Sequence, residues 1–160
     1  MSLNSQNLPY PDLIHPIIVH FVIAMVLFAF VCDIIGYFSR RYHLFEVSFW
    51  NLFVAAIAIF FAVFFGQLEA SLAKPYPAAQ STLNWHSVTG WSLSAIVVAI
   101  TAWRFAIRSR DPLKIPPAYL GVATFLVSLV LFQMYLGSQL MWVYGLHLEP
   151  IVEATKQGLL

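Results

Sequence analysis

Histidine is the side chain in this sequence best suited to ligand chemistry, and two of the five histidines open its first long apolar segment. His15 and His20 belong to the stretch His-Pro-Ile-Ile-Val-His-Phe. Imidazole binds haem iron, copper, zinc and non-haem iron, and it also donates or accepts hydrogen bonds. A polar ring held away from water needs one of these partners. The function of the chain therefore depends on what His20, the deeper of the two, contacts.

The composition is typical of a membrane protein. Of the 160 residues, 61% are hydrophobic and 9% are charged, whereas soluble chains carry about 25% charged residues. Long blocks almost without charge predict transmembrane helices. We therefore expect an all-α, polytopic membrane protein in which residues 1–160 form a single four-transmembrane-helix bundle. The expected segments are a polar N-terminal segment at 1–12, helices at about 16–38, 47–70, 83–107 and 118–144, and a C-terminal tail at 145–160.

Charge and motifs exclude several function classes. A net charge of +1 predicts no nucleic-acid partner. The expected surroundings are a lipid bilayer and other membrane subunits. The sequence has no Gly-x-Ser-x-Gly elbow, Gly-rich phosphate loop, Cys-x-x-Cys or His-Glu-x-x-His motif. Conventional hydrolytic chemistry is thus not indicated, and whether the protein is an enzyme stays open.

Lysine and arginine are concentrated in two of the expected connections. The first and third loops hold Arg40, Arg41, Arg104, Arg108, Arg110 and Lys114, and the other three segments outside the helices hold Lys74 and Lys156. The positive-inside rule then predicts that both termini lie on the non-cytoplasmic side. Four histidines are consequently expected at the outer face: His15, His20, His86 and His147.

His20 and His86 are predicted to lie at similar depth, each about one turn below the outer surface, on the first and third helices. Gly90 follows His86 by one turn on the same face and leaves room beside the ring. The space would accept a flat macrocycle or a neighbouring helix. A ligand role and plain interhelical hydrogen bonds are therefore both open for this pair.

Two further patterns concern helix packing. The second helix carries small or polar residues at helical spacing, which predicts close contact with another helix: Asn51, Ala55, Ala58, Ala62, Gly66 and Glu69. Asp33 lies near the cytoplasmic end of the first helix, where Arg104 of the third can neutralise it. We interpret Asp33 as a structural ion-pair residue rather than a proton relay.

The opening motif resembles that of a family of bacterial four-helix membrane proteins, the domain of unknown function 2231, and the likeness covers nearly the whole chain. The family pattern His-Pro-x-x-Val-His-Phe-Pro-Ile-Ala is matched from His15 to Ala24, with Val22 in place of the second proline. Asp33 and His86 are also similar to family positions. The resemblance implies a bacterial inner or internal membrane and association with respiratory redox complexes such as haem–copper oxidases.

The fourth helix departs from the family pattern. Where many members have a histidine, this chain has Tyr144, and His147 follows three residues later. If the family histidine is a ligand, Tyr144 or His147 is the residue that could replace it here.

Three hypotheses about function follow. In the first, His20 and His86 ligate haem b beside Gly90, and the protein transfers electrons as a component or subunit of a membrane redox complex. In the second, a non-haem metal ion is bound by imidazoles together with Glu69, the candidate ligands being His15, His20, His86 and His147. In the third, no cofactor is bound and the protein is an accessory or assembly subunit that packs against larger partners.

Overall fold

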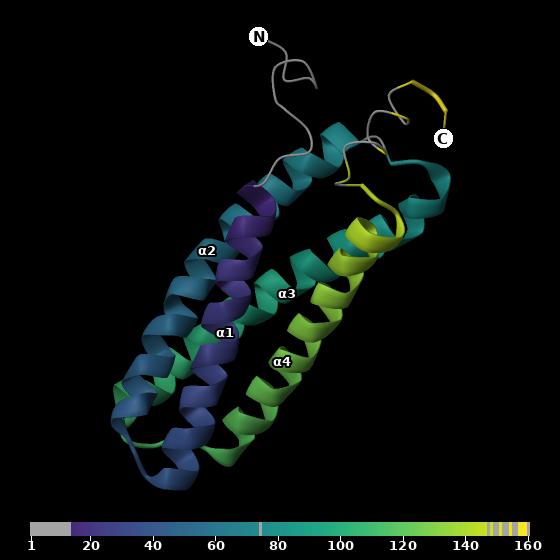
Figure 1. Ribbon diagram of the computed structural model, residues 1–160. Coiled ribbons are helices and arrows are strands. Elements are labelled where there is room, and N and C mark those ends of the chain that lie inside the picture. Colours follow the sequence, from purple (N-terminus) through teal and green to yellow (C-terminus); the bar gives the residue numbers. More distant parts are fainter. Residues whose placement is uncertain are drawn as a thin grey trace.

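The computed structural model describes residues 14–73, 75–146, 148, 151, 154 and 157–159. These residues form four long helices and a short π-helical extension: α1 (Ile14–Ser39), α2 (His43–Ala73), α3 (Pro77–Arg110), α4 (Pro117–Ser138) and η1 (Gln139–Val143). The helices run alternately up and down (Figure 1). The start of α1, the α2–α3 connection and η1 lie at one end, here called the terminal end. The other two connections lie at the loop end. The predicted all-α, four-helix fold is confirmed.

Helices α1, α2 and α3 extend beyond the boundaries predicted from the sequence, whereas α4 gives way to η1 before the predicted end at 144. α1 is already helical at Ile14, so His15 lies inside its first turn and not at its cap. α3 begins at Pro77, six residues before the predicted start at 83. Proline suits the first helical position, because the N–H that it lacks would have no partner there. His86 consequently lies in the third turn of α3, further from the helix start than predicted.

The outward faces of the bundle are apolar. All four long helices are long and apolar enough to cross a membrane. Large apolar side chains stay exposed along them, among them Ile17, Phe38, Phe60, Phe61, Phe64, Phe105 and Phe125. An apolar surface of this extent requires a lipid environment or a covering partner, and the length and composition of the helices identify lipid.

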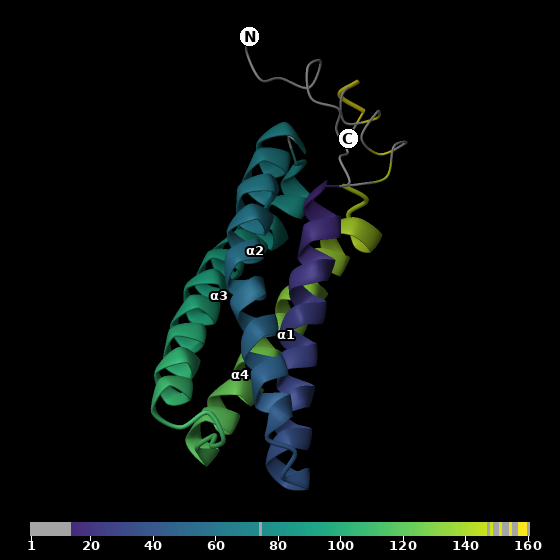
Figure 2. The same cartoon turned by 90° about the vertical axis from the view of Figure 1, so that its left-hand side faces the viewer.

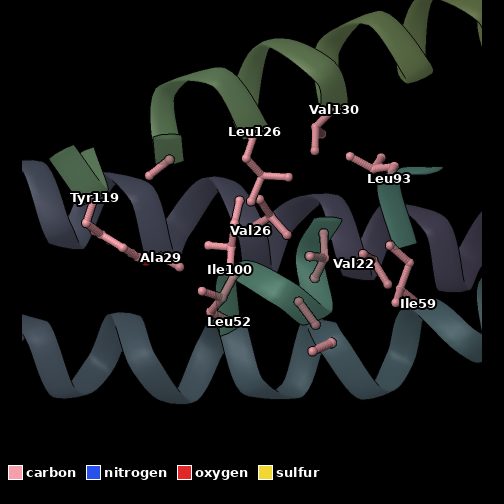
Figure 3. Packing of buried hydrophobic residues seen from close by; sticks show 14 of the residues in the cluster. Val22, Val26, Ala29, Leu52, Ile59, Leu93, Ile100, Tyr119, Leu126 and Val130 are labelled. Atoms are coloured by element: carbon pink, nitrogen blue, oxygen red, sulfur yellow. The ribbon is translucent and has the colours of Figure 1, made fainter. Parts of the chain in front are cut away.

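The core runs along the middle of the bundle. Figure 3 shows Val26, Ile100 and Leu126 meeting between α1, α3 and α4. Ala55 and Ala62 of the small-residue row on α2 are buried, and α2 makes its most extensive contact with α1. The predicted close helix contact of this row is therefore confirmed, because small side chains let the two backbones approach.

The two helical hairpins, α1–α2 and α3–α4, bury matching positions. With a shift of 71 residues (from 22 to 93), buried Val22, Val26, Ala29 and Asp33 correspond to buried Leu93, Val97, Ile100 and Arg104. The same shift relates buried Ser48, Phe49, Leu52, Ala55 and Ile59 to buried Tyr119, Leu120, Ala123, Leu126 and Val130. Of these pairs, only Val26 and Val97 share a residue type. This 71-residue repeat is thus one of burial pattern, and it makes the bundle two parallel hairpins of the kind found in other membrane proteins.

Asp33 and Arg104 occupy equivalent positions in this repeat and pair with each other near the loop end. Arg104 Nη2 lies 3.6 Å from Asp33 Oδ1, and both side chains are buried. The same nitrogen donates to the Phe45 carbonyl oxygen at 3.0 Å, and the guanidinium lies over the rings of Phe45 and Tyr119. The predicted ion pair is confirmed, and carbonyl and aromatic contacts accompany the buried charge.

Candidate functional site

A cavity of about 150 Å³ lies at the terminal end, where residues of all four helices line it. At this end, the start of α1 and the end of α4 lie on one side in Figure 2, and the end of α2 and the start of α3 lie on the other. Most of the wall is apolar, and the polar side chains on it are His15, Gln67, Glu69, His86, Ser87 and Gln133. Trp91 and Met134 also line the cavity and are exposed. The cavity therefore reaches the outer surface of the bundle.

His15 extends from the first turn of α1 onto α2. Its Nδ1 lies 2.8 Å from the carbonyl oxygen of Ala62. Its ring covers Gly66, where an added Cβ would lie 2.7 Å from His15 Cε1. Because a carbonyl oxygen can only accept, His15 Nδ1 carries a proton and donates it to Ala62. This hydrogen bond holds the His15 ring on α2.

His86 extends from α3 over Gly137 of α4, where an added Cβ would lie 3.3 Å from His86 Cε1. The Gln133 amide nitrogen lies 3.0 Å from the His86 carbonyl oxygen and 3.2 Å from its Nδ1. The Gln133 amide oxygen accepts a hydrogen bond from the Thr89 hydroxyl. The same amide nitrogen lies 3.4 Å from His86 Nε2, so the Gln133 amide contacts both ring nitrogens. These contacts hold the His86 ring against α4.

The two histidine sites are equivalent in the 71-residue repeat. The shift that relates His15 to His86 also relates Gly66 to Gly137. Each hairpin therefore packs a histidine of its first helix on a glycine near the end of its second helix. The two imidazoles line the same cavity. Imidazole nitrogens can donate or accept hydrogen bonds, so such a pair suits a polar group of a ligand.

The structure does not bring His20 and His86 together. His20 is exposed, its Nδ1 lies 2.6 Å from the Pro16 carbonyl oxygen, and it is not among the residues that line the cavity. His15 takes the position beside the cavity that was predicted for His20. Five residues separate the two, which is about 140° around a helix, so they cannot share a face.

The other predicted site residues have separate outcomes. Gly90 lines the cavity, and its missing side chain makes room for Gln133, whose amide nitrogen an added Cβ would approach to 3.2 Å. Tyr144 does not line the cavity, and its hydroxyl accepts a hydrogen bond from Thr82. His147 lies outside the described residues.

Three residues that complete the cavity were not assigned to the site from the sequence. Gln133 was visible as a polar residue in an apolar block. Leu140 lies on η1, and no sequence pattern predicts this π-helical turn. Gly145 has a φ of 65°, a conformation that glycine adopts without strain at a helix end. The chain then turns back, and Leu146 lines the cavity.

The described residues offer no compact metal site. No group of three or more His, Cys, Asp or Glu side chains among them could hold a metal ion. Glu69 is buried and lines the cavity together with His15 and His86. His20, the predicted fellow ligand, is exposed and is not among the residues that line this cavity.

Four membrane-crossing helices around a cavity with two imidazoles define a multi-pass α-helical membrane protein with a candidate ligand site. The chain belongs to the family described as predicted membrane protein (DUF2231), whose sequence model matches residues 11–150. The family resemblance of the opening motif is thereby confirmed. No curated protein and no solved structure matches the chain.

Proposed function

We propose that this integral membrane protein belongs to a membrane redox system and binds a redox-active ligand in the terminal-end cavity, between His15 and His86. The observation that carries the proposal is that two imidazoles, one from each hairpin, line a single and mostly apolar cavity. Ionisable side chains inside a membrane are costly and commonly mark functional sites. The family resemblance supports a place beside other subunits of a respiratory complex.

Haem b is one ligand of this kind, and His15 and His86 would hold it here. His15 suits the role, because metal-bound histidines usually donate their second ring N–H to a carbonyl or carboxylate. His86 would have to turn away from the Gln133 amide nitrogen, which lies 3.2 Å from its Nδ1 and 3.4 Å from its Nε2. The cavity of about 150 Å³ is smaller than the roughly 300–1,000 Å³ of sites for drug-sized ligands. Haem binding would therefore require the helices to move apart.

A cofactor-free accessory or assembly subunit is the second candidate. It is favoured by the protein partners that both rings already have, the Ala62 carbonyl for His15 and the Gln133 amide for His86. In this case the imidazoles would only join helices, and the apolar outer faces would pack against larger membrane subunits.

The test identifies what co-purifies with the protein from its membrane in mild detergent. Absorption spectra of the oxidised and reduced protein report haem, and mass spectrometry of an organic extract reports other redox-active ligands. We expect a stoichiometric ligand in the wild type that His15→Ala and His86→Ala lose. His20→Ala is the matched control and keeps the ligand, because His20 lies outside the cavity.

Two results would contradict this assignment. A ligand lost in His20→Ala and kept in His15→Ala would favour the pair predicted from the sequence. A folded wild-type protein that carries neither haem nor another redox-active ligand would overturn the proposal and favour the accessory subunit.

A further inference from the structure

We infer that the redox-active ligand is a lipid, with a hydrocarbon chain that enters the cavity from the bilayer past Trp91 and Met134 and ends against an inner aliphatic wall. The inference rests on the proposed function for the redox activity of this ligand, and it narrows the ligand to membrane-soluble molecules that carry a chain. The composition of the inner wall, the shape of the cavity and the depth of its opening carry the inference.

The inner wall of the cavity is aliphatic. His15 and His86 line the cavity near the terminal end, and buried aliphatic side chains of all four helices line it about two to three turns deeper. These side chains, here called the inner wall, are Val22, Val26, Ile59, Leu93, Val97 and Val130. Figure 3 shows most of them within the core. None of these side chains can form a hydrogen bond, so a polar group placed against them would be left unpaired, whereas a hydrocarbon group suits them.

The cavity is long and narrow. Its wall on α1 includes residues from His15 to Val26, and its wall on α3 includes the equivalent His86 and Val97. Each stretch covers 11 residues (15 to 26, 86 to 97), which is about 16 Å along a helix. A volume of about 150 Å³ spread along this length leaves little width. Since a cavity of about 150 Å³ can hold benzene, this one has room for roughly six carbons at the end of a single chain.

The opening of the cavity lies at the depth of the hydrocarbon layer. Trp91 and Met134 line the cavity and remain 55% and 39% exposed. Trp91 lies 19 residues before Arg110 at the end of α3 (91 to 110), and Met134 lies 17 residues after Pro117 at the start of α4 (117 to 134). Both are therefore about 26–28 Å from the loop end of their helices, within the roughly 30 Å of the hydrocarbon layer.

This depth determines how a ligand reaches the inner wall. The exposed side chains at the opening lie on helices that are long and apolar enough to cross the membrane, so lipid tails surround them. A chain can pass from the bilayer to the inner wall without crossing water. There it gains dispersion contacts with the side chains of the inner wall. The cavity therefore favours a ligand that carries a hydrocarbon chain over a ligand dissolved in water.

The inference is tested by photolabelling of the protein, washed in detergent and then placed in lipid nanodiscs. Two palmitic acid probes are used, one with a diazirine near the end of the chain and one with a diazirine near the carboxyl group, and mass spectrometry of peptides identifies the labelled residues. The chain-end probe should label inner-wall residues such as Val22 and Val97 as well as the exposed Phe60 and Phe125. The carboxyl-end probe should label exposed residues and not the inner wall. This comparison uses the wild-type protein and does not depend on the folding of a variant.

Two neighbouring valines on α3 provide a matched pair of variants. Val97 is buried and lines the cavity, whereas Val98 is exposed and is not among the lining residues. Val97→Phe fills the inner end of the cavity, so it should lose both the inner-wall label and the co-purified redox-active ligand. Val98→Phe adds the same bulk on the outer face and should keep both. Labelling of Phe60 and Phe125 should be equal in the two variants, which controls for their insertion in the bilayer.

Other outcomes overturn the inference or the proposed function separately. Absence of inner-wall labelling in the wild type, or equal inner-wall labelling by the two probes, contradicts the inferred position of the chain, and so does an inner-wall label that survives in Val97→Phe. A co-purified redox-active ligand without a hydrocarbon chain, haem included, refutes the inference and leaves the proposed function standing. A protein that takes the chain-end label but carries no redox-active ligand refutes the proposed function and leaves only the chain site.

Discussion

Each imidazole of the cavity depends on a glycine in the facing helix. An added Cβ at Gly66 would lie 2.7 Å from a His15 ring carbon, which is closer than normal contact allows. At Gly137 the corresponding distance from His86 is 3.3 Å, which a small shift can relieve. At Gly121 an added Cβ would meet no atom within 4 Å. The space for an added Cβ thus increases from Gly66 to Gly137 to Gly121, so alanine substitutions at these glycines test where the two rings lie.

Gly66→Ala should be the most harmful of the three substitutions. Overpacking of this kind typically costs about 1–3 kcal/mol, and the displaced ring would lose its hydrogen bond to Ala62. Gly137→Ala should cost less, and Gly121→Ala should be neutral or stabilising, because alanine favours the helix. Thermal unfolding of the three variants in detergent measures the order. If Gly66→Ala is as stable as Gly121→Ala, His15 does not lie over Gly66.

The sequence allowed the kinds of group at the site to be predicted, but not all of their partners. His86 and Gly90, which the sequence places one helical turn apart, both line the cavity. Helical periodicity separates His15 from His20 by about 140°, but it does not say which of them faces inward. That depends on how α1 packs on α2, where Gly66 admits a ring. The direction of the Gln133 amide depends on the α3–α4 contact and has no local sequence signal.

Helices α1 and α3 are joined near the loop end by the pair of Asp33 and Arg104. Removing one partner of a buried ion pair leaves an uncompensated charge and costs about 3–5 kcal/mol. Asp33→Leu alone should therefore destabilise the bundle strongly. The double variant Asp33→Leu/Arg104→Met removes both charges and should recover most of that loss. Thermal unfolding of the single and double variants measures the coupling, and strictly additive effects would show that the two side chains do not act as a pair.

The helices themselves were predictable because each is a long apolar block, but their ends were less so. The start of α3 was placed at 83, although Pro77 is compatible with a first helical turn. This error altered the expected depth of His86 and led to the pairing with His20. The π-helical turn of η1 depends on tertiary contacts at the end of α4, and no residue type in Gln139–Val143 specifies it.

The orientation of the whole molecule in the membrane remains a prediction with a direct test. Ser39 lies at the loop end and Gln80 near the terminal end, and both are exposed. Cysteines introduced at these positions in a Cys32→Ser background should differ in labelling by an impermeant thiol reagent on intact cells. We expect labelling at Gln80 and none at Ser39, because the basic connections are predicted to face the cytoplasm. The reverse pattern would invert the topology.

The matching hairpins also determine which halves of the molecule can associate. If two copies of the first hairpin packed as the two hairpins do in the intact chain, one Asp33 would face another. Two copies of the second hairpin would likewise place two Arg104 side chains against each other. Like charges in a dry core repel strongly. Unlike halves instead form the ion pair that the intact chain contains. Two segments made separately, divided at the α2–α3 connection, would therefore assemble one to one and reject their own copies. In the intact chain the α2–α3 connection keeps the two hairpins close together, and the opposite charges of Asp33 and Arg104 determine that each hairpin pairs with the other.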